Sequence, residues 1–352
     1  MAAGRAMVIQ DRKSMFAVFD LRRFSGSPLL SSFKYPNFRL FFGGQFLSLV
    51  GTWMQTVALS WLVYRMTGSS SALGVIGFAS MLPIFVLGLV FGVVADTFNR
   101  RGLLLGTQSV SLLQALALAL LTLSGRAEYW QLVTLATLLG VANALDIPTR
   151  QSFLVDLVGK EDLHNAIGLN SSMFHGARML GPALAGGLVG LIGEGWCFML
   201  NAVSYLAVIA GLLAMRNLPH TALPTGEPFR RRIGQGLSYA WQTPEVRSLL
   251  ALLSVSGLLG TCYLTLMPVF ADQILHGGPR GLGLLMGASG AGALIGAVVL
   301  AARKGIRGLS SWIALGAAGF GVSLMLFSQS RSFWLSMALL VPVGFSMIIE
   351  MA

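Results

Sequence analysis

The chain has 352 residues and a mass of 37.4 kDa, and 55% of its residues are hydrophobic while only 11% are charged. A soluble domain carries roughly 25% charged residues, so this composition excludes a soluble globular enzyme. The 24 Lys and Arg against 13 Asp and Glu give a formal net charge of +11, which in a soluble protein would suggest a nucleic-acid partner. The two cysteines, Cys197 and Cys262, lie in apolar stretches outside any metal-ligand pattern, which is typical of packing residues.

Residues 1–36 are basic and polar, and they contain no apolar core followed by a small-residue cleavage site. We therefore expect a cytoplasmic tail over this range rather than a cleaved signal peptide. The true start codon stays open, because Met7 and Met15 follow the first methionine.

Ten intervals with no charge, or with one, come next in the chain, and each is close to the roughly 20 residues that cross a bilayer as a helix. Continuous apolar blocks of this kind predict an all-α polytopic membrane protein and exclude a transmembrane barrel of short alternating strands. The intervals are 40–64, 66–95, 102–125, 129–145, 163–193, 195–215, 248–271, 281–302, 308–330 and 332–349.

Most lysines and arginines fall in the tail and in the loops after every second interval. By the positive-inside rule, this bias predicts a cytoplasmic N-terminus and a multi-pass protein of a bacterial-type inner (plasma) membrane. Topology and attraction to anionic lipid then explain the net charge, so no nucleic-acid partner is expected.

A polar segment, residues 216–243, separates six intervals from four and contains three prolines and three consecutive arginines. It predicts a cytoplasmic linker between an N-terminal six-helix bundle, residues 37–215, and a C-terminal bundle, residues 244–352.

The second interval closes with Gly92-Val-Val-Ala-Asp96-Thr97-Phe-Asn99-Arg100-Arg101. This segment resembles the signature loop of the major facilitator superfamily, Gly-x-x-x-Asp-Arg/Lys-x-Gly-Arg-Arg/Lys, with Thr97 in place of the basic residue and Asn99 in place of the second glycine. Gly92 is expected to allow a close helix approach, and Asn99 to adopt the left-handed turn.

The resemblance implies a gating latch formed by Gly92, Asp96, Arg100, Arg101 and Asp146. In related transporters the loop carboxylate docks at a helix N-terminus, and the loop arginine pairs with an acid in the fourth span. Asp96, Arg100 and Asp146 are the positions that match.

In the fifth interval, Gly168, Ala177, Gly181, Pro182 and Gly186 have the spacing of the superfamily's antiporter motif, which implies export rather than uptake. The segments 36–55 and 146–151 are similar to the branch of enterobactin exporters and transmembrane secretion effectors, which includes macrolide efflux proteins. The resemblance covers about residues 33–352. It implies a monomeric major facilitator fold that exports a small molecule, a siderophore or a hydrophobic drug such as a macrolide, by alternating access.

The superfamily has twelve spans and this chain ends within its tenth, so we expect an incomplete, four-helix C-terminal bundle. The alternative is a non-transporting membrane fragment or scaffold that lacks helices 11 and 12. The sequence contains no Walker loop, no HExxH pattern and no paired intramembrane carboxylates, so we expect no enzyme, metal or cofactor, and protons as the driving ion.

Polar residues of the first interval recur at Gln45, Ser48, Thr52 and Gln55, which places them on one helical face. We interpret Gln45, Thr52 and Gln55 as substrate-binding residues that line a cavity. The alternative is that they form hydrogen bonds between helices.

Arg178 lies in the middle of the fifth interval, where a charge costs at least about 2.5 to 3.5 kcal/mol. We interpret it as a residue that binds an anionic substrate such as a catecholate, and the alternative is that it pairs structurally with an acid or with carbonyls. His175, one turn earlier, and Glu350 in the last interval are candidates for proton coupling, although His175 could equally be a packed neutral imidazole. Asp272 and Glu194 are expected to be solvated charges at the rim.

Overall fold

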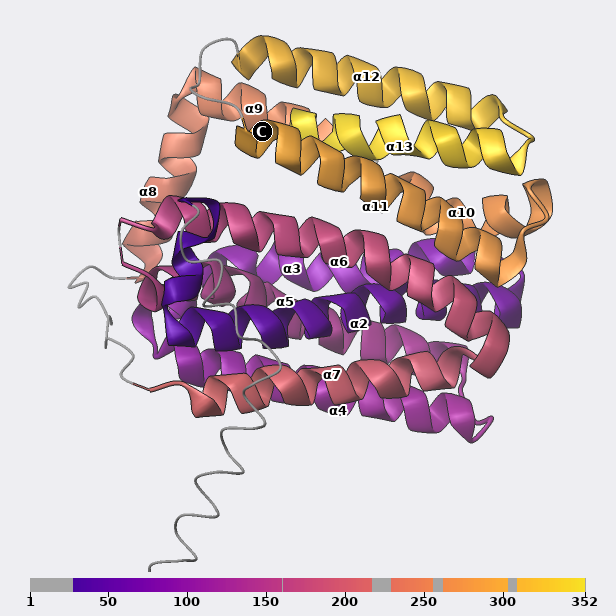
Figure 1. Ribbon diagram of the computed structural model, residues 1–352, viewed down its shortest axis with the longest axis horizontal. Helices are drawn as coiled ribbons and strands as arrows, with labels where there is room; N and C mark the ends of the chain where they lie inside the picture. The colour runs from indigo at the N-terminus through magenta and orange to yellow at the C-terminus, as the bar shows by residue number, and fades with distance from the viewer. Residues whose placement is uncertain (1–27, 160, 217–228, 256–261, 303–308, 352) are drawn as a thin grey trace, which may run out of the picture.

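The fold is described from a computed structural model, in which residues 28–159, 161–216, 229–255, 262–302 and 309–351 can be described. Every regular element in these ranges is a helix, which confirms the predicted all-α fold. A short 3-10 helix, η3 (Pro28–Lys34), precedes six long helices that run back and forth (Figure 1). They are α2 (Pro36–Thr67), α3 (Ser70–Thr97), α4 (Arg100–Leu123), α5 (Tyr129–Leu157), α6 (Leu163–Ile192) and α7 (Glu194–Ala214).

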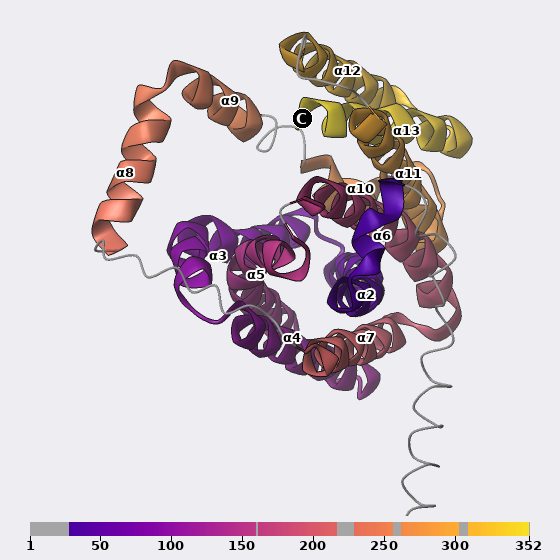
Figure 2. The same cartoon turned by 60° about the vertical axis from the view of Figure 1, so that its left-hand side comes forward.

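The second half of the chain contributes a smaller group of helices that packs against the first through α6 and α11 (Figure 2). In the same view α8 and α9 lie to one side of both groups, and α8 contacts the first group at α3. The elements are α8 (Phe229–Gln242), α9 (Pro244–Val255), α10 (Cys262–Val269), the π-helix η5 (Phe270–Ile274), α11 (Gly278–Ala302), α12 (Leu309–Gln329) and α13 (Phe333–Glu350).

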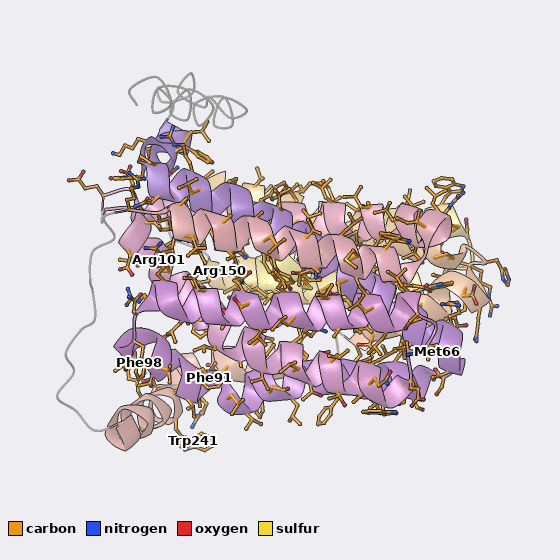
Figure 3. All side chains as sticks on the ribbon, turned by 90° about the horizontal axis from the view of Figure 1, so that it is seen from below. Met66, Phe91, Phe98, Arg101, Arg150 and Trp241 are labelled. Carbon is orange, nitrogen blue, oxygen red and sulfur yellow. The ribbon has the colours of Figure 1, made fainter. Side chains whose placement is uncertain are left out.

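Because successive long helices are antiparallel, their ends gather at two opposite ends of the molecule. We call the end at which α2 begins the basal end and the end at which α2 stops the distal end. Figure 3 shows Phe98 and Arg101 at the basal end and Met66 at the distal end.

Local sequence sets several helix boundaries. Gly68 ends α2 in the left-handed conformation with φ 60°, and the side chain of Ser69 then accepts a hydrogen bond from the Ala72 amide at the start of α3. Asn99 caps α4 in the same way, because its side-chain oxygen accepts from the Gly102 amide. Its φ is −62° and its ψ 107°, so the expected left-handed turn at Asn99 is wrong. The Asn99 side chain is used as a helix cap instead.

Eight of the described helices are long and apolar enough to cross a membrane: α2, α3, α4, α5, α7, α11, α12 and α13. Their outward faces are apolar. On α3, for example, Phe85 is 85% exposed and Phe78 64% exposed, as expected for surfaces that contact lipid.

Two of the ten predicted spans differ from these eight. Helix α6, with 30 residues, is not one of the eight, and it carries the polar residues Asn170, Ser171, Ser172, His175 and Arg178. The span predicted over 248–271 covers α9, α10 and part of η5, and its middle, residues 256–261, lies outside the described residues.

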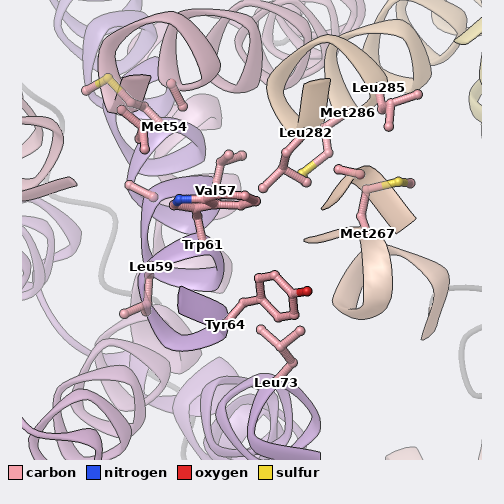
Figure 4. Packing of buried hydrophobic residues seen from close by; sticks show 14 of the residues in the cluster. Met54, Val57, Leu59, Trp61, Tyr64, Leu73, Met267, Leu282, Leu285 and Met286 are labelled. Atoms are coloured by element: carbon pink, nitrogen blue, oxygen red, sulfur yellow. The ribbon is translucent and has the colours of Figure 1, made fainter. Parts of the chain in front are cut away.

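The buried core shared by both halves lies on the distal side. Its members from the first six helices all come from their distal parts, such as Trp61 and Tyr64 at the end of α2 and Leu73 at the start of α3. Figure 4 shows Trp61 and Tyr64 facing Met267 of α10 and Leu282 of α11.

A second cluster fills the basal end, and its described members all belong to the first half. They are Phe38, Phe41, Leu104, Phe153, Leu154, Leu157, Val158, Ala166, Val208, Leu212 and Met215. In the described part of the chain, the apolar core therefore joins the two halves on the distal side alone.

Candidate functional site

Arg178 lies midway along α6, where that helix meets the second half of the chain. Its guanidinium carbon lies 5.4 Å from the ring centroid of Trp53 on α2, and its Nη2 donates a long hydrogen bond of 3.6 Å to the Sδ of Met347 on α13. Tyr263 of α10 is close enough to interact with it electrostatically, and the Tyr263 hydroxyl is 2.9 Å from the Ser289 Oγ of α11. Three helices other than α6, namely α2, α10 and α13, thus contribute side chains around this guanidinium.

The Arg178 side chain is only 8% exposed, yet no carboxylate in the described residues forms an ion pair with it. Buried charges are normally paired, because desolvation is costly. The structural ion pair that the sequence left open is therefore not formed with any described acid. One turn earlier, Nδ1 of the half-buried His175 also has no hydrogen-bond partner among the described residues.

The polar stripe of α2 forms hydrogen bonds inside the first half. Gln55 donates to Gln114 Oε1 of α4 at 3.1 Å, and its own Oε1 accepts from Asn201 of α7 at 2.8 Å. The Thr52 hydroxyl lies 3.1 Å from the hydroxyl of Tyr205 on α7. Gln45 is buried at 3% exposure. Thr52 and Gln55 therefore form hydrogen bonds between helices, which is the alternative interpretation of the polar stripe. The structure does not bring either side chain to Arg178.

The predicted pair between Arg100 and Asp146 is not formed. Arg100 Nη1 binds both carboxylate oxygens of Asp156, at 2.8 and 3.0 Å, and the Ser152 carbonyl at 3.3 Å. Asp146 lies nearly three turns further into the bundle. Its Oδ1 accepts from Thr107 and Gln108 of α4, each at 2.8 Å.

Residues of the loop between α3 and α4 lie at the basal end, as the resemblance implies. Asp96 is half-buried near the end of α3, and Arg101 Nη2 donates to the Leu213 carbonyl of α7 at 3.1 Å. Gly92 has open space where a Cβ would be, so the expected close helix approach at Gly92 is wrong.

Close helix approach occurs instead in the antiporter-like motif. A Cβ on Gly181 would lie 2.7 Å from the Val50 carbonyl oxygen of α2, and one on Gly186 would lie 2.8 Å from the Gly283 Cα of α11. Real side chains do not fit at such distances. Ala177 is fully buried and Pro182 is buried, whereas Gly168 has open space beside it.

The α6–α11 contact continues along both helices. A Cβ on Gly283 would lie 2.6 Å from the Pro182 carbonyl oxygen, and one on Gly290 would lie 2.6 Å from that of Arg178. We call this contact, formed by residues 178–190 of α6 and 279–290 of α11, the glycine seam. Small residues allow two backbones in a membrane to touch in this way.

Polar contacts at the distal end include two that the sequence analysis missed. Arg65 binds the Glu194 carboxylate through Nε at 2.9 Å and Nη2 at 3.1 Å, and Glu194 is only 7% exposed. Asp272 accepts a hydrogen bond of 3.2 Å from the Tyr64 hydroxyl. The expectation that Glu194 is a solvated rim charge is wrong, whereas Asp272 is half-buried and bonded to Tyr64. The predicted topology could have indicated these contacts, since it places all four residues at one membrane face.

At the basal end, the start of α6 is tied to the segment before α2. The Nζ of Lys34 lies 2.6 Å from Oδ2 of Asp162, and the Tyr35 hydroxyl donates to the same oxygen at 2.9 Å. The hydrogen bond from Lys34 is the main cause that lowers the pKa of Asp162 to about 2, and it raises the pKa of Lys34.

Glu350 is the last residue of α13 and is 4% exposed. Its backbone nitrogen passes close to α12, because a Cβ on Gly316 would lie 2.7 Å from it. It lies on the opposite half from His175, so the two candidates for proton coupling are held by different helix groups.

Comparison with known proteins shows which family and which transporters this sequence is similar to. The profile of a family described as transmembrane secretion effector matches residues 27–352. The staphyloferrin A transporter of Staphylococcus aureus is 26% identical over 82% of this chain and 72% of its own length. The multidrug efflux pump Tap of Mycolicibacterium fortuitum is 24% identical over 84% of this chain and 74% of its own. The macrolide efflux protein A of Streptococcus pyogenes is 23% identical over 76% and 67%.

The fold is also similar to a solved structure. That structure is a bacterial homologue of the human lysosomal transporter Spinster, in an inward-facing and unoccupied conformation. The match has a TM-score of 0.60 and 14% identity, and covers 89% of this chain and 72% of the other.

Proposed function

This chain belongs to the transmembrane secretion effector family of major facilitator transporters, and from that premise we propose that it exports a siderophore or a drug-like small molecule by alternating access. It is a multi-pass membrane protein, and its relatives are transporters rather than enzymes. The names of those relatives, a siderophore transporter and efflux pumps for drugs, support this choice of substrates.

The observation that carries the proposal is the asymmetric contact between the two halves. They share an apolar core on the distal side and are joined by the glycine seam, while the basal cluster belongs to the first half. Small residues along the seam let the halves rotate without separating large side chains. Such a rotation would open the distal side and close the basal side around a site between them.

We propose that the N-terminus is cytoplasmic, which makes the basal end the inner face. The excess of lysine and arginine in the tail and in alternate loops supports this orientation. The moving units would be the bundles 37–215 and 244–352, connected by 216–243, with one chain sufficient for transport. The structure then represents a state closed toward the outside.

A latch at the inner face would bias the two states. Asp96 and Arg101 take part at the ends of α3 and α4, and Arg100 holds that loop to α5 through Asp156. Asp146 supports the latch from within the bundle, through its hydrogen bonds to α4.

Proton drive is the form of coupling we propose. His175 has a nitrogen without a partner beside the interface of the halves, and Glu350 is a buried carboxylate in the other half. Both groups can gain and lose a proton when the interface is exposed to one side or the other.

The experiment is a retention assay in an efflux-deficient bacterium that expresses the chain, loaded with a macrolide or with a catecholate siderophore. We expect lower retention of at least one compound, and recovery of retention when an uncoupler is added. Gly283→Val should abolish the effect, because the side chain collides with Pro182 and Gly186. Gly187→Val is the matched control, since nothing lies within 4 Å of its Cβ position. Unchanged retention of both compounds, with the protein present in the membrane, would contradict the proposal.

A further inference from the structure

Arg178 is a buried cation with no carboxylate partner in the part of the chain that the structure describes. Lys34, Arg65 and Arg100 each form an ion pair with a carboxylate. Arg178 is less exposed than the side chains of Lys34 and Arg65, yet it has no acid among the described residues. Burying a charge without a partner costs free energy, and ionisable residues that are retained inside a membrane despite this cost usually serve binding or transport.

The contacts of Arg178 leave most of its hydrogen-bonding capacity unused. A guanidinium has five N–H donors, and in the described residues their only hydrogen-bond acceptor is the thioether of Met347 at 3.6 Å. An acceptor that a ligand brings to this group would therefore meet donors that the protein leaves unused. The Trp53 ring covers one face of the group, which orients it but supplies no acceptor.

The neighbouring groups indicate the chemistry of a ligand that would bind here. Nδ1 of His175, one turn away on α6, is a second polar atom without a partner. Trp53 and Met347 supply flat and polarisable apolar surface. A planar anion satisfies the guanidinium best, because its two oxygens match two parallel N–H groups.

From this arrangement, and resting on the transport function proposed above, we propose that the substrate carries a carboxylate on a flat apolar body and binds with that carboxylate against Arg178. The site lies between α2, α6, α11 and α13, which belong to both halves. A bound anion would therefore contact both moving units and would cancel the buried charge during the rotation.

The test uses the purified chain in lipid nanodiscs and two probes of the same shape, 2-naphthoate and its neutral isostere 2-naphthamide. We expect equilibrium binding at least tenfold tighter for naphthoate. Arg178→Gln should remove this preference and leave naphthamide binding unchanged, and Arg178→Lys should keep part of it. Arg126→Gln removes the same charge from an exposed loop, so it should behave as the wild type.

Thermal unfolding without ligand separates binding from folding. Because Arg178→Gln removes an unpaired buried charge, its unfolding temperature should equal or exceed that of the wild type. Equal affinity for the two probes, no naphthoate binding by the wild type, or a naphthoate preference that survives in Arg178→Gln would each overturn the proposal. A naphthoate preference that depends on Arg178, in a protein that exports nothing in the retention assay, would contradict the transport function alone.

Discussion

The hydroxyl of Tyr64, in the last turn of α2, donates a hydrogen bond of 3.2 Å to Oδ2 of Asp272 in the π-helix η5. This bond joins the first half of the chain to the second at the distal end. Tyr64 also packs in the apolar core that the halves share. This one side chain therefore makes both apolar and polar contacts between the halves on the distal side.

Tyr64→Phe should favour opening of the distal side, because it keeps the ring and removes only the donor. A hydrogen bond of this kind contributes about 0.5 to 1.5 kcal/mol, or about two- to tenfold in the equilibrium. Spin labels on α3 and α12 would measure the change as a longer distance between the distal ends. Tyr129→Phe is the control, since Tyr129 bonds the Ala72 carbonyl within the first half. Equal distances in Tyr64→Phe and wild type would contradict the assigned role.

Arg100 and Asp156 should depend on each other for stability. Both side chains are largely buried, so Arg100→Ala, which removes the arginine from this buried ion pair, should lower the free energy of unfolding by about 3 to 5 kcal/mol. The exchange Arg100→Asp with Asp156→Arg should recover much of that loss in thermal unfolding. If instead Arg100→Asp with Asp146→Arg recovers it, the sequence-based pairing is right and the one described here is wrong.

Gln55 should act on stability rather than on substrate affinity. Gln55→Leu leaves the amides of Gln114 and Asn201 without their partner, which costs about 1 to 3 kcal/mol. We expect a lower unfolding temperature with unchanged binding of 2-naphthoate. A loss of affinity without a loss of stability would restore the interpretation that Gln55 lines the cavity.

Gly283→Ala should loosen the glycine seam. The new Cβ would lie 2.6 Å from the Pro182 carbonyl oxygen, and overpacking of this kind costs about 1 to 3 kcal/mol. Gly187→Ala adds the same methyl group one residue from the seam partner Gly186, where nothing lies within 4 Å. We expect thermal unfolding to shift downward for Gly283→Ala, and to stay level or rise for Gly187→Ala because alanine favours the helix.

The attachment of η3 to α6 should be lost in strong acid and in strong base. The pKa of Asp162 is lowered to about 2, so its ionic contact is fully present above the unfolded value of 3.8 and disappears as the pH falls through about 2. The pKa of Lys34 is raised, so its contribution is complete below 10.5 and is lost as the pH rises through the folded value. Hydrogen exchange of residues 28–36 should therefore differ between wild type and Asp162→Asn by a constant amount at pH 5 to 9. A difference that varies across that window would contradict the assigned cause.

Sequence periodicity and charge predicted the helices well, because the length of an apolar run and the residues that cap it act locally. The partners of Arg100 and Gln55 could not be predicted in this way. Asp156 and Asp146 are both acids in the second half of α5, and only the packing of α4 against α5 decides which of them Arg100 reaches. Gly92 and Gly186 both fit small-residue motifs, but whether a second backbone lies beside them depends on the tertiary arrangement.

The position of the glycine seam along α6 makes the motion of the two ends unequal. From Gly186 the distal end of α6 is about 9 Å away and its basal end about 35 Å away, at 1.5 Å per residue. If the halves turn about the seam as rigid levers, the basal ends travel about four times as far as the distal ends. A small displacement at the distal end is then enough to break the contact between Tyr64 and Asp272, while the same rotation moves the basal ends of the helices much further.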